Sequence, residues 1–227
     1  MIYKGYIFDL DGTVLDSMGV WHDVDVEFLG KRGLPFSEEY GKAISHMKLE
    51  LAAEYTVELY GLNEKPSDIM REWLDMAEYE FKCRVGLKPY AKELLELLHG
   101  LGIPVAAATT SRRSLYRPAL ERNGILGYFD AFSDAENAER GKDSPEIFLR
   151  AAEMLGKEIK DCIVFEDTPQ AIRTAKKAGF TVAAVAEKGK AVDSDFFGSA
   201  DMVIEDFTGV FKELKREAEC KKIFAVN

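Results

Sequence analysis

The chain has 227 residues, 40 of them acidic and 30 basic, and a formal net charge of −10 at pH 7. This length suits one large domain or a domain with a smaller insert. A hydrophobic content of 47% is enough to build a buried core. The acidic balance argues against nucleic acid, whose binding requires a basic face, and against an anionic membrane surface. We expect neither of these as a partner.

The three cysteines, Cys83, Cys162 and Cys220, are far apart and form no Cys-x-x-Cys pattern. This spacing is typical of a reducing compartment and argues against a disulfide frame or a thiolate zinc site. The N-terminus lacks a signal-peptide pattern. The longest apolar runs, 103–108 and 181–186, are much shorter than the roughly 20 residues that span a bilayer. We therefore expect a soluble, cytoplasmic protein, and nothing in the sequence requires more than a monomer.

Short apolar runs alternate with amphipathic helical stretches along most of the chain. Strands are predicted over 2–9, 103–109, 162–166, 181–185 and 202–204, with a weaker candidate over 128–132. Helices are predicted over 91–99, 145–155 and 169–178. Because the strand runs are apolar on both faces and alternate with helices, the pattern predicts an α/β fold: a Rossmann-like parallel sheet covered by helices on both sides.

One segment, residues 17–86, contains no strand-like run. Its apolar residues recur at helical spacing in three stripes: Trp21, Val24, Phe28 and Leu29; Leu51, Tyr55 and Leu59; and Ile69, Trp73 and Met76. A structureless loop of this length is uncommon in a compact domain. We therefore predict an inserted α-helical cap domain over 17–86, with Trp21 and Trp73 in its core, and a core domain formed by 1–16 and 87–227.

Polar side chains follow the ends of several predicted strands. They are Asp9 and Asp11 after the first strand, Thr109 and Thr110 after the second, Lys142 in the loop before the helix at Pro145, and Glu166 and Asp167 at the end of a later strand. Ligands of open parallel sheets bind outside the carboxyl ends of the strands. We therefore expect these groups to meet at one edge of the sheet.

Each of these groups has a chemical use. Carboxylate oxygens from Asp9, Asp11 and Asp167 suit Mg²⁺, which prefers oxygen ligands. A carboxylate beside such a cation can attack an electrophilic phosphorus and form an aspartyl-phosphate. The ammonium of Lys142 and the hydroxyls of the threonines that follow the second strand are suited to hold the oxygens of the transferred group.

The segment Phe8-Asp9-Leu10-Asp11-Gly12-Thr13 resembles the first motif of the haloacid dehalogenase superfamily. The other motifs of that family have counterparts in order at 105–109, at Gly141-Lys142, and at 163–168 followed by Ala171-Ile172. The helical insert between the first two motifs is similar to the C1-type cap of the β-phosphoglucomutase-like branch.

This resemblance implies roles for individual residues. Asp9 would be the nucleophile and Asp11 the general acid and base. The expected Mg²⁺ ligands are Asp9, Asp11, Asp167 and Glu166, and the expected phosphate-binding residues are Thr109, Thr110 and Lys142. The candidate contacts to the rest of the substrate are His22, Ser45, His46 and Arg112.

The predicted function is a Mg²⁺-dependent phosphatase that hydrolyses a small phosphorylated metabolite, a sugar phosphate or a related monoester, through an aspartyl-phosphate. A sugar phosphomutase is the alternative within the family. It is disfavoured because His46 stands where the mutase-like relatives carry an arginine for a second phosphate. The alternative of another class is a non-catalytic phosphate-binding or receiver-like module, and the presence of Asp11 argues against it.

Overall fold

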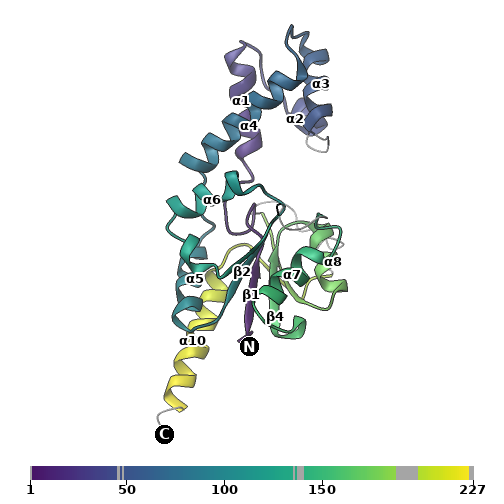
Figure 1. The fold of residues 1–227 in the computed structure, drawn as a ribbon. Coiled ribbons are helices and arrows are strands. Elements are labelled where there is room, and N and C mark those ends of the chain that lie inside the picture. The colour runs from purple at the N-terminus through teal and green to yellow at the C-terminus, as the bar shows by residue number, and fades with distance from the viewer. Residues whose placement is uncertain are drawn as a thin grey trace. The chain divides into compact units, whose positions relative to one another are not determined.

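The computed structural model describes residues 2–44, 47, 49–134, 136, 141–187 and 199–224, the last four by their backbone only. The chain divides into two compact units. One consists of Met1–Asp16 with Gly86–Asn227, and the other of Ser17–Val85. The first contains the sheet and the second is helical (Figure 1).

Among the described residues, six strands form one sheet in the order β3-β2-β1-β4-β5-β6. Every neighbouring pair is parallel. The strands are β1 (Gly5–Phe8), β2 (Val105–Ala108), β3 (Ala131–Ser133), β4 (Cys162–Glu166), β5 (Thr181–Val185) and β6 (Met202–Ile204). The predicted parallel α/β sheet with a helical insertion between its first two strands is confirmed.

The helices of the sheet unit cover both faces of the sheet (Figure 1). They are α5 (Ala91–Gly100), α6 (Arg113–Arg122), α7 (Glu146–Met154), α8 (Pro169–Lys177) and α10 (Thr208–Phe224), with short 3₁₀ turns η1 (Leu126–Tyr128) and η2 (Ile159–Asp161). Helix α7 packs on β1, β2 and β3, and α8 packs on β4 and β5. On the other face α5 packs on β2 and is flanked by α10.

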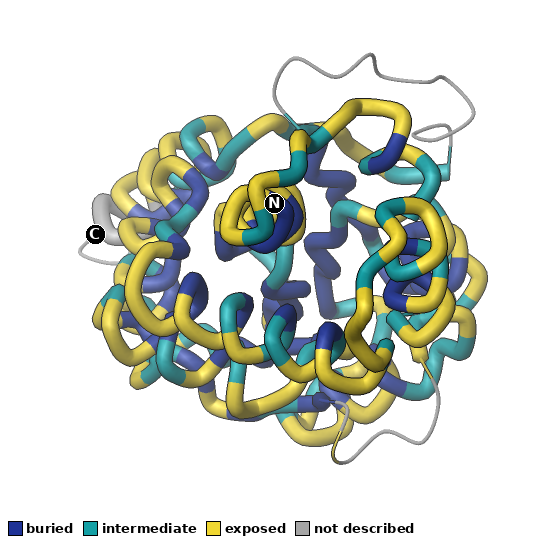
Figure 2. The backbone as a smooth tube through the Cα atoms, turned by 90° about the horizontal axis from the view of Figure 1, so that it is seen from above, coloured by how far each residue is buried: buried dark blue, intermediate teal, exposed yellow. Residues whose placement is uncertain are grey.

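Side chains of β1 alternate between these two layers, as the pleat of a strand requires. Ile7 belongs to the core formed with α7 and α8. Phe8 points the opposite way, where its ring stacks on Phe165 at a centroid distance of 4.7 Å and lies 5.7 Å from Phe207. Strands β1, β2 and β4 are buried along their whole length, and Figure 2 shows buried segments in dark blue inside helices with exposed outer faces.

The weaker strand candidate over 128–132 is misplaced, because β3 begins only at Ala131 and η1 occupies Leu126–Tyr128. The carboxylate of Asp130 accepts the backbone N–H of Val105 at 2.8 Å. The backbone N–H of Asp130 in turn donates to the Val105 carbonyl at 2.8 Å, so Asp130 is bound to the start of β2 through both its side chain and its backbone, and β3 follows at Ala131.

The helical unit contains α1 (Val20–Lys31), α2 (Glu38–Ile44), α3 (Leu49–Tyr60) and α4 (Pro66–Cys83). Helices α1 and α3 both pack on α4. The ring of Phe28 on α1 meets Trp73 on α4 edge to face at 5.3 Å. None of the helices in the described part of the chain is long and apolar enough to cross a membrane.

Two predicted helical stripes are wrong in detail. In α1 the predicted residues Val24, Phe28 and Leu29 are buried, but Trp21 is 44% exposed and Asp25, one turn further on, is only 8% exposed. In α3 the large residues Leu51 and Leu59 are exposed. The buried residues of α3 are instead small: Ala52, Ala53 and Thr56, whose hydroxyl lies 3.0 Å from that of Tyr40 on α2. The burial of Trp73 is as predicted.

The aromatic cluster beneath β1 and β4 gives a test of the sheet unit. Phe207 is fully buried against the rings of Phe8 and Phe165. Phe207→Ala should lower the free energy of unfolding in urea by about 3–5 kcal/mol, because it removes a ring and leaves a cavity. Phe207→Leu should cost less than about 1.5 kcal/mol. Equal losses in the two variants would contradict this packing.

Candidate active site

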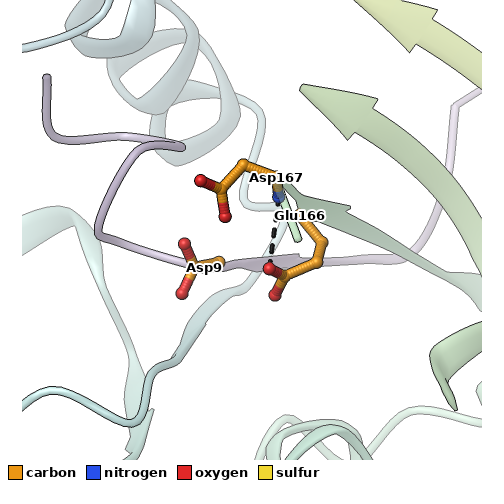
Figure 3. Close-up of side chains that lie close together, drawn as sticks. All are labelled: Asp9, Glu166 and Asp167. Carbon is orange, nitrogen blue, oxygen red and sulfur yellow. Dashed lines mark hydrogen bonds between the residues drawn. The ribbon is translucent and has the colours of Figure 1, made fainter. Parts of the chain in front are cut away.

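Parallel pairing of β1 with β4 brings carboxylates together at the carboxyl edge of the sheet. Phe8 is in register with Phe165, and the backbone N–H of Asp9 donates to the Phe165 carbonyl at 2.9 Å. Asp9 therefore lies beside Glu166, with Asp167 next in the chain (Figure 3). One carboxylate oxygen from each of the three residues lies within 4.8 Å of the other two.

Lys142 joins two of these carboxylates. Its ammonium donates to Oδ1 of Asp9 and to Oε2 of Glu166, the latter at 2.7 Å. The other oxygen of Glu166, Oε1, accepts the hydroxyl and the backbone N–H of Thr168 at 2.9 and 3.0 Å and the N–H of Asp167 at 3.2 Å. Both carboxylate oxygens of Glu166 thus accept hydrogen bonds. They position Lys142 and the loop before α8.

The second carboxylate oxygen of Asp9 has no such partner. This oxygen, Oδ2, is buried and finds no hydrogen-bond partner among the described residues. Such an orphaned buried acceptor is unfavourable on its own and indicates that a ligand completes the site. Asp9 and Asp167 are therefore the carboxylates best placed to accept one.

The crowding of buried negative groups shifts their protonation. Burial, reinforced by Glu166 and Asp11 and opposed by Lys142, raises the pKa of Asp9 to about 7. Burial together with Asp9 and Glu166 raises the pKa of Asp167 to about 9. Burial disfavours the charge on Lys142, but the two carboxylates it contacts outweigh that effect and raise its pKa. At neutral pH the site therefore binds protons that a cation would displace.

A tight turn follows Asp9. The carbonyl of Leu10 accepts the backbone N–H groups of Val14 at 3.0 Å and of Leu15 at 2.8 Å. Gly12 has a φ of 78°, a left-handed conformation that favours glycine. The turn carries Asp11, which is partly exposed and two residues past Asp9. The Asp-x-Asp-Gly sequence therefore forms a sharp turn directly after β1.

The second strand end lies on the other side of β1. Phe8 is in register with Ala107 of β2, so Thr109 reaches the same edge of the sheet as Asp9. Thr109 is buried, and its hydroxyl accepts the N–H of Ser111 at 3.0 Å. Thr110 and Arg112 are exposed, and Arg112 directly precedes α6. The structure thus brings the residues predicted after the first strand, after the second strand and at Glu166-Asp167 to one edge of the sheet, together with Lys142.

A buried cluster behind the second strand end was not foreseen from the sequence. Asp134 follows β3, is fully buried, and accepts the hydroxyl of Tyr116 at 2.6 Å and a guanidinium N–H of Arg113 at 2.8 Å. Burial disfavours its charge, but these two donors lower the pKa of Asp134. The cluster anchors the first turn of α6 and thereby the segment 109–112. Its one sequence signal is the position of Asp134 directly after a strand.

The remaining candidates belong to the helical unit. His22 is exposed on α1, with its ring 4.7 Å from that of Phe36. Ser45 and His46 lie outside the described residues. Contact of these three residues with a substrate stays a prediction.

Comparison with known proteins identifies the class to which this fold and site belong. The family model of haloacid dehalogenase-like hydrolases matches residues 3–179. The chain belongs to this family and is therefore a hydrolase.

Particular relatives are similar over most of the chain. The fructose-1-phosphate phosphatase of Escherichia coli is 29% identical over 177 residues, which cover 78% of this chain and 93% of that protein. The bifunctional riboflavin kinase/FMN phosphatase of Arabidopsis thaliana is 31% identical over 90% of this chain, which spans only 53% of that longer protein. A solved structure of a proposed β-phosphoglucomutase from Thermotoga maritima has a TM-score of 0.83 at 23% identity and covers 94% of this chain and 99% of that one, which shows a shared fold.

The raised pKa values predict how stability depends on pH without divalent cations. The folded state holds protons on Asp9 and Asp167 up to about pH 7 and about pH 9, whereas the unfolded state loses them near the ordinary value of 3.8. Their contribution to stability is therefore fully present below that value and lost as pH rises through the folded-state values.

In a chelator, the unfolding temperature should fall between about pH 5 and about pH 9, and Asp167→Asn should flatten the fall. Glu153→Gln, at an exposed position of α7, is the matched control and should keep the wild-type trend. A variant and a wild type with parallel pH profiles would show that Asp167 is not protonated in the folded protein.

Proposed function

We propose that this hydrolase is a Mg²⁺-dependent phosphatase. Its substrate is a small phosphorylated metabolite, a sugar phosphate or a related monoester, and the reaction passes through an aspartyl-phosphate on Asp9. The observation that carries the proposal is the meeting of Asp9, Glu166, Asp167 and Lys142 at the carboxyl edge of one sheet. Phosphatases among the relatives support the same class of reaction.

The residues at this edge fit Mg²⁺. The donors are all oxygens, as a hard divalent cation requires, and Oδ2 of Asp9 is buried without a partner. Asp9, Asp167 and the backbone carbonyl of Asp11 would hold the ion, with Glu166 behind them. When bound, Mg²⁺ would offset the negative charge of the phosphoryl oxygens that otherwise repel Asp9.

The first chemical step belongs to Asp9 and Asp11. A carboxylate oxygen of Asp9 attacks the phosphorus, and the bond from phosphorus to the ester oxygen breaks. Asp11 donates its proton to the departing oxygen, so the metabolite leaves as an alcohol. Lys142 orients Asp9 through its hydrogen bond and places a positive charge beside the transferred group.

The second step restores the enzyme. Asp11, now a carboxylate, takes a proton from a water molecule, and the resulting hydroxide attacks the phosphorus of the aspartyl-phosphate. The bond from phosphorus to Asp9 breaks, which releases inorganic phosphate and returns the carboxylate. Thr109, Thr110 and Lys142 hold the phosphoryl oxygens through both steps. His22, Ser45, His46 and Arg112 contact the organic part of the substrate.

Hydrolysis of a generic aryl phosphate tests this proposal. Wild type should release phosphate only when Mg²⁺ is present, and a chelator should stop the reaction reversibly. Asp9→Asn and Asp11→Asn should each lower kcat by about a thousandfold or more, since the nucleophile or the proton donor is lost. Glu153→Gln, on the exposed side of α7, is expected to keep full activity.

Three results would decide against the proposal. Activity that survives in Asp9→Asn would remove the nucleophile from its assigned place. Rapid isomerisation of a hexose 1-phosphate with only slow release of phosphate would favour the mutase. A long-lived aspartyl-phosphate that forms from a phosphoryl donor and does not turn over would favour the receiver-like module.

A further inference from the structure

A short segment, residues 109–112, joins the end of β2 to the start of α6, and it is held at both ends. At its start, the backbone N–H of Thr109 donates to the carbonyl of Ser133, the last residue of β3, at 3.0 Å. Directly after it, the guanidinium of Arg113, the first residue of α6, donates to the buried carboxylate of Asp134 at 2.8 Å. Two successive residues at the end of β3 therefore set the position of this segment.

Both carboxylate oxygens of Asp134 accept hydrogen bonds. Oδ2 accepts the hydroxyl of Tyr116 at 2.6 Å and the Nη2 and Nε groups of Arg113 at 2.8 and 3.2 Å. Oδ1 accepts the backbone N–H of Glu136 at 3.2 Å. The ring of Tyr116 is itself buried and stacks on that of Phe132 in β3, with the ring centroids 5.6 Å apart. Two side chains of α6 are thus fixed to the end of β3 in a defined orientation.

The sequence of α6 gives the start of this helix little support of its own. The side chain of Arg112 makes no capping hydrogen bond, and the first turn contains no acidic residue. Arg113 instead adds a positive charge at the end of the helix that already carries a positive partial charge. Pro118 removes an N–H donor from the interior of the helix. Asp134 therefore supplies, from outside the helix, the negative charge that the first turn lacks.

Stability alone gives a weak reason for this buried cluster, because apolar side chains of similar volume often serve a fold equally well. Hydrogen bonds between a guanidinium and a carboxylate are directional, so what the cluster supplies is a fixed geometry. The segment that it fixes contains Thr110, which is exposed and makes no hydrogen bond among the described residues. The hydroxyl and the backbone N–H of Thr110 are therefore available to an anion.

We propose that Asp134 is a positioning residue of the phosphatase. Through Arg113 and Tyr116 it fixes the start of α6, and through α6 it holds Thr110 where that residue donates to an oxygen of the phosphoryl group. The inference rests on the proposed function and adds to it a fully buried residue that acts only through its neighbours. A displacement of about 1 Å in such a donor lowers a rate by as much as about a hundredfold. The effect of Asp134 is therefore expected on the transition state more than on the binding of substrate.

The kinetics of Asp134→Asn test this inference, because the variant keeps the size of the side chain and removes its charge. With Mg²⁺ and an aryl phosphate, kcat should fall about 10- to 100-fold while KM changes less than about threefold. The inhibition constant of orthovanadate, whose bound form resembles the transition state of phosphoryl transfer, should rise by about the same factor as kcat falls. Tyr116→Phe removes one donor to Asp134 and should shift both quantities in the same direction by a smaller factor.

The vanadate measurement separates positioning from a general loss of stability. A variant that is only less stable contains fewer active molecules, which lowers the apparent kcat and leaves KM and the inhibition constant unchanged. Asp130→Asn is the matched control. Its carboxylate accepts the backbone N–H of Val105 at 2.8 Å, at the opposite end of the same two strands. This variant should keep the kcat and the vanadate inhibition of the wild type.

An active wild type whose vanadate inhibition is unchanged in Asp134→Asn would overturn this inference and leave the proposed function in place. If Asp134→Asn does not fold, Tyr116→Phe decides in the same way. A wild type that releases no phosphate with Mg²⁺ would overturn the proposed function and this inference with it.

Discussion

The parallel pairing of β1 with β4 is the constraint on which the site depends. It sets Asp9 beside Glu166, and the loop after β4 adds Asp167. Buried carboxylates this close repel one another and hold protons at neutral pH, as the raised pKa values of Asp9 and Asp167 show. Lys142 relieves only part of this repulsion, since it contacts Asp9 and Glu166 but not the open oxygen of Asp9. The fold therefore concentrates negative charge at the carboxyl edge of the sheet, and a bound cation would compensate it.

A cation at this position would explain how an acidic protein can bind an anionic substrate. The net charge of −10 repels polyanions from the surface as a whole. At the carboxyl edge of the sheet, however, four of the acidic groups (Asp9, Asp11, Glu166 and Asp167) lie near one another, and Lys142 contacts two of them, Asp9 and Glu166. A bound divalent cation would bring the local sum to about −1, or near zero when Asp11 holds its proton. The charge that a phosphate meets is therefore set by the site and not by the composition of the chain.

The sequence predicts the sheet unit well because its signals do not depend on context. Strand runs such as 162–166 are apolar on both faces, which only a buried sheet satisfies, and residues at the ends of parallel strands share one edge. The cluster of Asp134 with Arg113 and Tyr116 could not be foreseen, since a buried carboxylate and its donors meet only after β3 and α6 have packed. In the helical unit the periodicity places Val24, Phe28 and Leu29 of α1 correctly and fails at Trp21. Trp21 and Asp25 lie one turn apart on α1, and hydrophobicity assigns the core to the tryptophan, whereas the structure buries the aspartate.

The same physical rule applies to the buried carboxyl groups of both units. A charge held away from water must be met by an opposite charge, and the degree to which the protein meets it sets what a ligand must bring. At the sheet edge Lys142 supplies one positive charge, and under the proposed function a divalent cation would supply the rest. In the helical unit Arg32 is already committed to Glu64 and Glu72, and it also lies over the ring of Phe28. Asp25 has no such partner among the described residues, and burial raises its pKa to about 7. The proposed phosphatase would accordingly bind its anionic substrate through a metal at the sheet edge, whereas a buried carboxyl without a cationic partner is met by a proton.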